Sequence, residues 1–310
     1  MKAWIDGKFV RWDKIVVSPL SHSFSRGSAI FEVVDIVQTT RSLLGKSKKS
    51  GSAFFGLTAH IDRFYNSARL SYMDIPIQKE ALSDALKKTA RKNGITAGVA
   101  KFFAYYSAIE FNITPKDRTV TIAIFCFDFG RTGLDVRLLS RPVNAVISPL
   151  KKIPADAVPV HAKVSGSYIN SYIAKMDAKR RGFGEVILLD DKGFVAEGAT
   201  SNIFFVKKNT IMTPSLDSAL PGVTRKVIIQ LARDLGYELK ETNILPSDLP
   251  SFNEAFYSGS VVHIQPIREI DGTAVGSACP GAVTASLEKE MGRLLAGENE
   301  TYHPLLTPIT

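Results

Sequence analysis

The sequence predicts an α/β protein of two domains. Its 310 residues are enough for two hydrophobic cores, and 45% hydrophobic with 22% charged residues is typical of a globular protein. Strand-like apolar runs alternate with segments in which apolar residues recur every three or four positions, as in helices. A polar, glycine-containing stretch near residue 130 interrupts this alternation. We therefore expect a small N-terminal domain over 1–127, a linker over 128–135 and a larger domain over 136–310.

The N-terminal domain is expected to combine strands and helices. The dipeptide Asp6-Gly7 between two short apolar runs predicts a hairpin over 5–10. The basic insert over 45–51 is expected to form a solvent-exposed hairpin tip. The remaining elements are predicted strands at 29–37, 100–106 and 119–127 and predicted helices at 58–73 and 78–93, the last of which is followed by Gly94.

The C-terminal domain continues the alternation. Predicted strands lie near 136–139 and at 185–189, 202–206 and 254–260, and predicted helices lie at 223–235 and 280–295. An apolar stripe predicts a further helix that ends near Gly182. Its members are Ile169, Tyr172, Ile173 and Met176.

Lys163 is predicted to stand at the head of that helix. A cation is unusual there, because the positive end of the helix dipole disfavours it. Most lone lysines simply extend into solvent. An amine whose pKa is lowered by desolvation or by a nearby dipole can instead act as a nucleophile. Lys163 is therefore our candidate catalytic residue.

Composition limits the function classes. The net charge is +9, but the basic residues are scattered and are not interleaved with aromatic residues, so we expect no nucleic-acid partner. No run approaches 18 apolar residues, so we expect no membrane span. The two cysteines, Cys126 and Cys279, form no metal or disulfide motif, which favours a reducing compartment, and we assign no metal ligands. A cytoplasmic protein is expected.

Three other segments could complete a site around the amine. Glu197 lies among small residues, where a carboxylate can pair with the nitrogen of a flat ring, although a turn or capping role is the ordinary interpretation. Val223 and Thr224 follow Pro221-Gly222 at a helix start and offer amides and a hydroxyl to an anion. The turn at 258–260 offers further amides and hydroxyls. An amine, a ring-nitrogen partner and an anion cradle are what pyridoxal 5'-phosphate (PLP) needs from a protein.

The chain resembles the class IV, or fold-type IV, PLP-dependent aminotransferases. This family includes the branched-chain amino acid and D-amino acid aminotransferases and aminodeoxychorismate lyase. The resemblance runs from about Trp4 to Thr284 and depends on six short motifs in the family's order. They are Ala29-Ile30-Phe31-Glu32, His60-Ile61-Asp62-Arg63-Phe64, the residues 162–168 around Lys163, the residues 196–204 around Glu197, the residues 221–225, and Ser258-Gly259-Ser260.

The resemblance implies a role for each motif. Lys163 would bind PLP as a Schiff base and move a proton between substrate and cofactor. Glu197 would keep the ring nitrogen protonated, and Tyr168 would hydrogen-bond the phenolic oxygen. The residues that match the family's phosphate-binding positions are Arg63, Val223, Thr224 and Ser260. The implied fold is that of the D-amino acid aminotransferases, two α/β domains with the cofactor between them, normally in a homodimer whose partner helps to close the site.

Two departures from the branched-chain enzymes affect the expected substrate pocket. Those enzymes usually carry Tyr-x-Arg on the strand that matches 100–106, which here reads Ala-Lys-Phe-Phe-Ala-Tyr-Tyr, and a tyrosine where this chain has Arg26. The segment 31–34 is similar to the D-amino acid enzymes, whereas 166–171 is similar to the branched-chain group. The motifs alone therefore leave the handedness of the substrate open.

Four residues are candidates for the substrate pocket. Arg26 and Lys101 could each face a substrate carboxylate or form a surface ion pair, and Phe31 and Val261 fall near the expected pocket. We expect a transaminase that uses small amino acids and 2-oxo acids, first of all branched-chain L-amino acids with 2-oxoglutarate. D-amino acids come second and an aminodeoxychorismate lyase third. A non-catalytic homologue is least favoured, because Lys163 and Glu197 are both intact.

Overall fold

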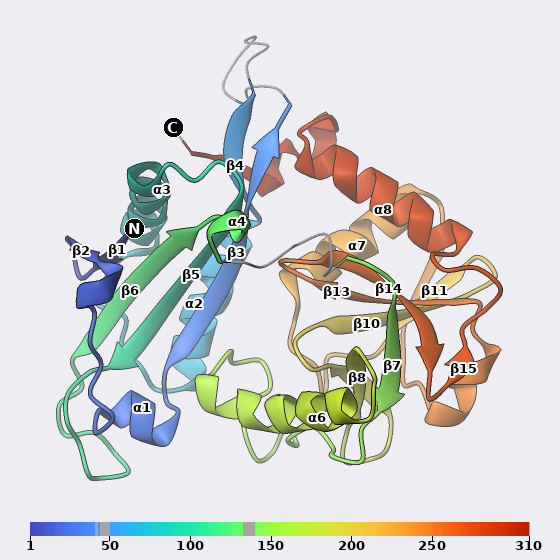
Figure 1. Ribbon diagram of the computed structural model, residues 1–310, viewed down its shortest axis with the longest axis horizontal. Coiled ribbons are helices and arrows are strands. Elements are labelled where there is room, and N and C mark those ends of the chain that lie inside the picture. The colour runs from blue at the N-terminus through green and yellow to red at the C-terminus, as the bar shows by residue number, and fades with distance from the viewer. Residues whose placement is uncertain (41–42, 44–49, 133–139, 310) are drawn as a thin grey trace. The chain divides into compact units, whose positions relative to one another are not determined.

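The computed structural model (Figure 1) describes residues 1–40, 43, 50–132 and 140–309. The predicted strand near 136–139 and most of the predicted hairpin tip at 45–51 lie outside this part of the chain. Within the described residues, no helix has both the length and the apolar character needed to cross a membrane.

The chain forms two compact units. The first consists of Met1–Asp135, Ala162–Gly166 and Arg293–Thr310, and the second of Val136–His161 and Ser167–Gly292. Two segments that the sequence places in the C-terminal domain therefore pack with the first unit. One of them carries Lys163.

A seven-stranded antiparallel sheet forms the centre of the first unit. Its strands are β1 (Lys2–Ile5), β2 (Lys8–Arg11), β3 (Ile30–Thr39), β4 (Gly51–Phe55), β5 (Gly98–Tyr106), β6 (Val120–Phe127) and β16 (Leu306–Pro308). Their order across the sheet is β16-β4-β3-β5-β6-β1-β2. Asp6 and Gly7 both have positive φ in the β1–β2 turn, which confirms the predicted hairpin. The edge strand β16 was not predicted.

Helices cover one face of this sheet. Helices α2 (Leu57–Leu70) and α3 (Lys79–Asn93) pack there on alternate residues of β3 and β5, including Val34 and Phe102. Gly94 ends α3 in the left-handed conformation, as its position predicts. The opposite face is only partly buried. The shorter helical segments are α1 (His22–Arg26), α4 (Phe129–Thr132) within the predicted linker, and the 3-10 turns Trp12–Lys14 and Glu300–Leu305.

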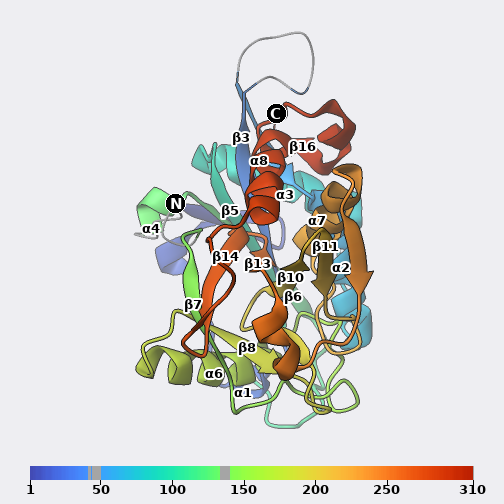
Figure 2. The same ribbon diagram turned by 90° about the vertical axis from the view of Figure 1, so that its right-hand side faces the viewer.

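A nine-stranded mixed sheet forms the centre of the second unit. Its strands are β7 (Val143–Ile147), β8 (Glu185–Leu189), β9 (Val195–Gly198), β10 (Asn202–Lys207), β11 (Thr210–Thr213), β12 (Glu238–Glu241), β13 (Glu254–Gly259), β14 (His263–Ile270) and β15 (Thr273–Ala274). The order is β12-β11-β10-β13-β14-β7-β8-β9, with β15 paired to β14. Strand β7 runs parallel to its neighbours β8 and β14, and Figure 2 shows β7 beside β14.

One helix of this unit exposes the apolar residues that predicted it. The helices are α6 (Tyr168–Arg180), α7 (Val223–Asp234) and most of α8 (Ala282–Leu295), with a 3-10 turn at Pro246–Ser251. A further 3-10 turn, Ser165–Ser167, directly precedes α6. Helix α6 buries Ala174 and Ala178, and α6 packs beside β8. Its larger apolar side chains are between 38% and 60% exposed, and they are Ile169, Tyr172, Ile173 and Met176. We call these four residues the α6 stripe.

Candidate active site

Lys163 lies on an extended segment rather than at a helix start. Helix α6 begins at Tyr168, after a 3-10 turn over Ser165–Ser167. The prediction that Lys163 heads this helix is therefore wrong. The physical reason is that the residues just after Lys163 pair with the sheet of the first unit before the helix can begin.

The segment Lys163–Gly166 runs antiparallel beside the residues that lead into β3. Three backbone hydrogen bonds join them: Phe31 N to Lys163 O (3.1 Å), Ser165 N to Ala29 O (2.7 Å) and Gly166 N to Gly27 O (2.8 Å). A Cβ at Gly27 would lie 2.8 Å from Gly166 Cα, so this crossing needs a glycine. On the other side, Lys163 N donates to Ser67 Oγ of α2 (2.9 Å). Two elements of the first unit thus fix the backbone of Lys163.

The amine of Lys163 lies near the ring of Phe31. Its Nζ is 4.9 Å from the centroid of that ring. Lys101 Nζ lies 5.1 Å from the Phe31 centroid and 5.1 Å from the Phe103 centroid. The register of the sheet produces this cluster, because Phe31 is opposite Phe103 and Val33 is opposite Lys101. The structure therefore brings together three predicted site residues, Lys163, Phe31 and Lys101.

The amine of Lys101 is partly withdrawn from water. Burial lowers the pKa of Lys101, and the positive charge of Lys163 lowers it further. Both effects disfavour the ammonium form, and a nearby anion would counteract both.

Glu32 lies on the opposite, helix-covered face and binds Arg63. The fully buried carboxylate accepts hydrogen bonds from Arg63 Nε (2.6 Å) and Nη2 (2.8 Å), and its Oε2 lies 2.8 Å from His60 Nδ1. Burial acts to raise the pKa of Glu32, but the charge and hydrogen bonds of Arg63, with those of His60, hold it well below its usual range. This fork orients the guanidinium. The sequence indicated Arg63, but no role was assigned to Glu32.

His60 makes the stability of this cluster sensitive to pH. Burial is the largest effect on the pKa of His60 and lowers it, although Glu32 acts to raise it. The unfolded chain therefore takes up a proton below about pH 6.5 before the folded chain does. The free energy of unfolding is expected to fall by up to about 1.4 kcal/mol per pH unit as the pH drops from 6.5 toward 5.5. Urea unfolding at pH 7.5, 6.5 and 5.5 measures this slope.

Two histidine variants isolate that contribution. His60→Gln is expected to reduce the slope, whereas the exposed His161→Gln is expected to keep the wild-type slope. A wild-type unfolding free energy that stays constant between pH 7.5 and 5.5 would exclude the effect.

Glu197 lies at the centre of a polar cluster in the second unit. It is buried on β9, and its Oε2 accepts hydrogen bonds from Asn202 Nδ2 (3.2 Å) and Leu220 N (3.2 Å). Lys152 Nζ forms an ion pair with its Oε1. The structure therefore places an oriented carboxylate where the sequence indicated a ring-nitrogen partner. Lys152 was not predicted, because it is 45 residues away from Glu197 and carries no motif of its own.

The start of α7 and the end of β13 lie close to Asn202. Asn202 is opposite Ser258 in the β10–β13 register, and a Cβ at Gly222 would lie 2.0 Å from Asn202 Oδ1. Within the described part of the chain, the buried Thr224 Oγ1 and Ser258 Oγ have no hydrogen-bond partner. Orphaned buried hydroxyls are uncommon, and beside the free amides at the start of α7 they suit a phosphate. The residues present thus fit the phosphate of PLP.

The remaining candidate residues lie at the two ends of helices and in a turn. Tyr168 is the half-buried first residue of α6, and Ser260 and Val261 lie in the turn between β13 and β14. Arg26 is exposed at the end of α1, where its Nη2 donates to Phe111 O (3.1 Å). The interaction observed for Arg26 is thus with a backbone carbonyl of the β5–β6 loop.

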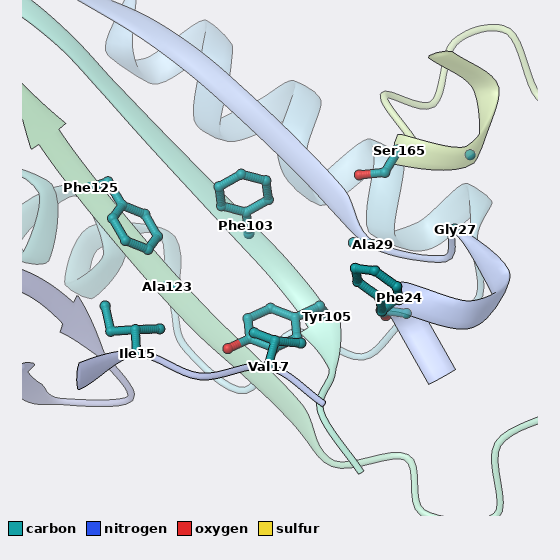
Figure 3. A pocket seen from close by; sticks show the side chains of 12 residues that line it. Ile15, Val17, Phe24, Gly27, Ala29, Phe103, Tyr105, Ala123, Phe125 and Ser165 are labelled. Atoms are coloured by element: carbon teal, nitrogen blue, oxygen red, sulfur yellow. The ribbon is translucent and has the colours of Figure 1, made fainter. Parts of the chain in front are cut away.

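An apolar pocket opens on the half-buried face of the first sheet. Its volume is about 430 Å³. Figure 3 shows lining residues from the sheet, from α1, from the segment that carries Lys163, and from the chain between the 3-10 turn Trp12–Lys14 and α1, which contributes Ile15 and Val17. Its lining includes Phe24, Phe103, Tyr105, Phe125, Ser165 and Gly166. Phe103 also contacts the Lys101 amine, so the pocket adjoins the cluster around Phe31.

Known proteins resemble this chain over nearly its whole length. The model of the family "Amino-transferase class IV" matches residues 39–270. A branched-chain-amino-acid aminotransferase of Pseudomonas aeruginosa is 30% identical over 299 residues, which are 96% of this chain and 94% of the relative. The solved branched-chain aminotransferase of Thermoproteus uzoniensis with norvaline has a TM-score of 0.91 at 32% identity, over 100% of this chain and 99% of that chain.

A second solved structure carries a phosphopyridoxyl group. It is a branched-chain amino acid aminotransferase complexed with N-(5'-phosphopyridoxyl)-L-glutamate, with a TM-score of 0.91 at 30% identity, over 100% of this chain and 98% of that chain. The resemblance seen in the six motifs and the expected α/β fold are thereby confirmed. The protein belongs to the class IV aminotransferase family.

Proposed function

We propose that this aminotransferase uses PLP to transfer the amino group of branched-chain L-amino acids to 2-oxoglutarate. The observation that carries the proposal is the fixed position of Lys163, whose backbone is held by β3 and α2 and whose amine lies 4.9 Å from the Phe31 ring. The names of the relatives support the substrate class, since both solved relatives and the Pseudomonas protein are branched-chain aminotransferases.

Three residues would act on the ring of the cofactor. PLP, when bound, supplies an electron-withdrawing ring that stabilises negative charge at the substrate's α carbon. Lys163 would hold the cofactor through its amine and take the proton from the α carbon. Glu197, oriented by Asn202 and Lys152, would keep a proton on the ring nitrogen. Tyr168 would donate a hydrogen bond to the phenolic oxygen.

A second group of residues would hold the phosphate. Thr224 offers an unpartnered buried hydroxyl beside the amides of α7, which begins at Val223. Ser260 would add the amide or hydroxyl of its turn. Arg63 would add a guanidinium oriented by Glu32.

The apolar pocket supports a donor with an apolar side chain. Aromatic and aliphatic side chains dominate its lining, and it adjoins the segment that carries Lys163. Burial of a branched aliphatic group there would be favourable by about 0.8 kcal/mol for each CH₂ removed from water.

A stereochemical donor screen tests the proposed substrate class. Purified protein loaded with PLP is supplied with 2-oxoglutarate and either L-leucine or D-alanine, and the glutamate formed is measured. L-leucine is expected to give the larger kcat/KM by at least about tenfold. A preference for D-alanine would replace the proposal by a D-amino acid aminotransferase. Pyruvate release from aminodeoxychorismate, without transamination of either donor, would replace it by the lyase.

We further propose a homodimer that works in the cytoplasm. The exposed α6 stripe in the second unit supports an interface, because large contiguous apolar surface is rarely left in water. In the first unit, Phe24, Phe111 and Ile113 are between 67% and 80% exposed. The unpaired cysteines, Cys126 and Cys279, are consistent with a reducing compartment.

A charge placed on the α6 stripe is expected to weaken the dimer. Tyr172→Glu would bury a carboxylate in an apolar interface, so its dimer dissociation constant should rise at least about tenfold. Light scattering coupled to size exclusion, over a dilution series, measures this. Lys88→Glu, on an exposed position of α3, serves as the control and should leave the dimer intact. A wild-type protein that is monomeric at micromolar concentration would refute the proposed dimer.

A further inference from the structure

Unlike Lys152 and Lys175, Lys101 is a half-buried lysine with no acidic partner in the part of the chain that the structure describes. Lys152 forms an ion pair with Glu197, and Lys175 forms one with Glu185. Within the described residues, no carboxylate forms an ion pair or a hydrogen bond with Lys101. A half-buried ammonium without an anion is unfavourable unless something else stabilises it.

Two aromatic rings provide part of that stabilisation. The Nζ of Lys101 lies 5.1 Å from the centroid of Phe31 and 5.1 Å from that of Phe103. Distances of this size allow a cation–π interaction with each ring. Such contacts orient the amine, but they do not neutralise it. The side chain is therefore held in a defined place with its charge uncompensated.

A second amine, that of Lys163, lies close enough to Lys101 to act on its charge. Lys163 Nζ lies 4.9 Å from the Phe31 centroid, so the two nitrogens are at most about 10 Å apart, the sum of their distances to that point. Two cations on one face of the sheet, without a carboxylate on Lys101, form a region of positive potential. Such a region attracts an anion that reaches both the reacting amine and Lys101.

We propose that Lys101 binds a carboxylate of the substrate and so selects amino acids and oxo acids over simple amines. This inference rests on the proposed function, in which the reacting carbon lies beside Lys163. In any 2-amino acid the carbon of the α-carboxylate is one bond from that carbon, and in glutamate the carbon of the second carboxylate is three bonds from it along the side chain. Either carboxylate could bridge toward an amine that is no more than about 10 Å from Lys163 Nζ, and either would supply the anion that Lys101 does not have among the described residues.

A matched pair of amino donors tests the selection. L-leucine and 3-methylbutylamine share one side chain and differ only in the carboxylate. Lys101→Met keeps the unbranched shape and most of the length of the side chain and removes its charge. This variant is expected to lose about 10- to 100-fold in kcat/KM with L-leucine or glutamate, while kcat/KM with 3-methylbutylamine stays within about twofold. Lys101→Arg should recover part of the loss, because it restores a cation.

The pattern of losses identifies which carboxylate is bound. Loss with both leucine and glutamate assigns Lys101 to the α-carboxylate. Loss with glutamate alone would assign Lys101 to the distal carboxylate and would overturn the proposed selection against simple amines. Lys8→Met, which removes one exposed charge from β2, is the control and should match the wild type. Wild-type kcat/KM with both amino acids in Lys101→Met would overturn the inference.

Binding of unreactive acids separates this inference from the proposed function. Glutarate and 4-methylvalerate carry carboxylates but no amino or oxo group, so calorimetric titration measures their affinity without turnover. Lys101→Met should raise the dissociation constant of at least one of them about tenfold or more. If the wild type binds these acids but transaminates no donor, the proposed function fails while the role of Lys101 can still be judged. Equal affinities in the wild type and Lys101→Met would refute the role of Lys101.

Discussion

Replacing Lys163 by alanine is expected to abolish transamination. The amine of Lys163 is the proposed attachment point of PLP and the proposed base at the substrate's α carbon, so one substitution removes both functions. We expect kcat to fall by about 10³-fold or more. The backbone contacts to Ser67 and Phe31 do not need the lysine side chain, so the variant should fold and bind PLP without a covalent link. Steady-state glutamate formation measures the loss.

Two comparisons make the Lys163 result specific. Lys192→Ala removes an exposed lysine in the second unit and should leave kcat unchanged. Addition of methylamine to Lys163→Ala should restore part of the activity, because a small amine can take the place of the missing one. Activity of Lys163→Ala within tenfold of the wild type would contradict the proposed role of Lys163.

Replacing Glu32 by glutamine is expected to lower the free energy of unfolding strongly. The carboxylate is fully buried, and the substitution leaves the guanidinium of Arg63, itself only 9% exposed, without its anionic partner. Removal of one member of a buried ion pair typically lowers the free energy of unfolding by about 3–5 kcal/mol. Urea unfolding of the cofactor-free protein at pH 7.5 measures the change.

An exposed glutamate provides the control for Glu32. Glu238 pairs with Lys240 at the surface, so Glu238→Gln should leave the unfolding free energy close to that of the wild type. The double variant Glu32→Leu/Arg63→Leu should recover much of the stability lost in Glu32→Gln, because no buried charge is then left unpaired. Wild-type stability in Glu32→Gln would show that the buried pair contributes little.

The sequence predicted those parts of the fold that depend on contiguous residues. Asp6-Gly7 predicted a turn, Gly94 predicted a helix end, and the strand-like apolar segment 29–37 predicted the strand observed at Ile30–Thr39. The C-terminal strand β16 was missed because it is a strand only through its pairing with β4, about 250 residues earlier. Pairing between segments so far apart in the chain produces little recognisable pattern in the residues of the strand itself.

The helix after Lys163 illustrates a second limit. An apolar stripe at helical spacing predicts a helix, but it does not indicate what the stripe contacts. In α6 the alanines are buried within the unit and the large apolar residues are exposed. Helical spacing likewise does not indicate that the segment at Lys163 pairs with the residues leading into β3. For that reason Lys163 was predicted at the helix start.

The sequence identified a candidate site residue only where that residue lies in a recognisable motif. Lys163, Glu197 and Thr224 each lie in a short motif; in the structure, the Lys163 amine lies near the Phe31 ring, Glu197 accepts a hydrogen bond from Asn202, and the Thr224 hydroxyl is buried. Glu32 and Lys152 act on Arg63 and Glu197 across 31 and 45 residues. Such partners are determined by sheet register and packing, which no local pattern contains.

The most direct test of Lys163 as the cofactor-binding amine is chemical fixation followed by peptide mapping. Protein loaded with PLP is treated with borohydride, digested and analysed by mass spectrometry. The phosphopyridoxyl group is expected on the peptide that contains Lys163 and to be absent from Lys163→Ala. A label found instead on Lys101 or Lys152, or no label on a protein that has bound PLP, would contradict the assignment of Lys163.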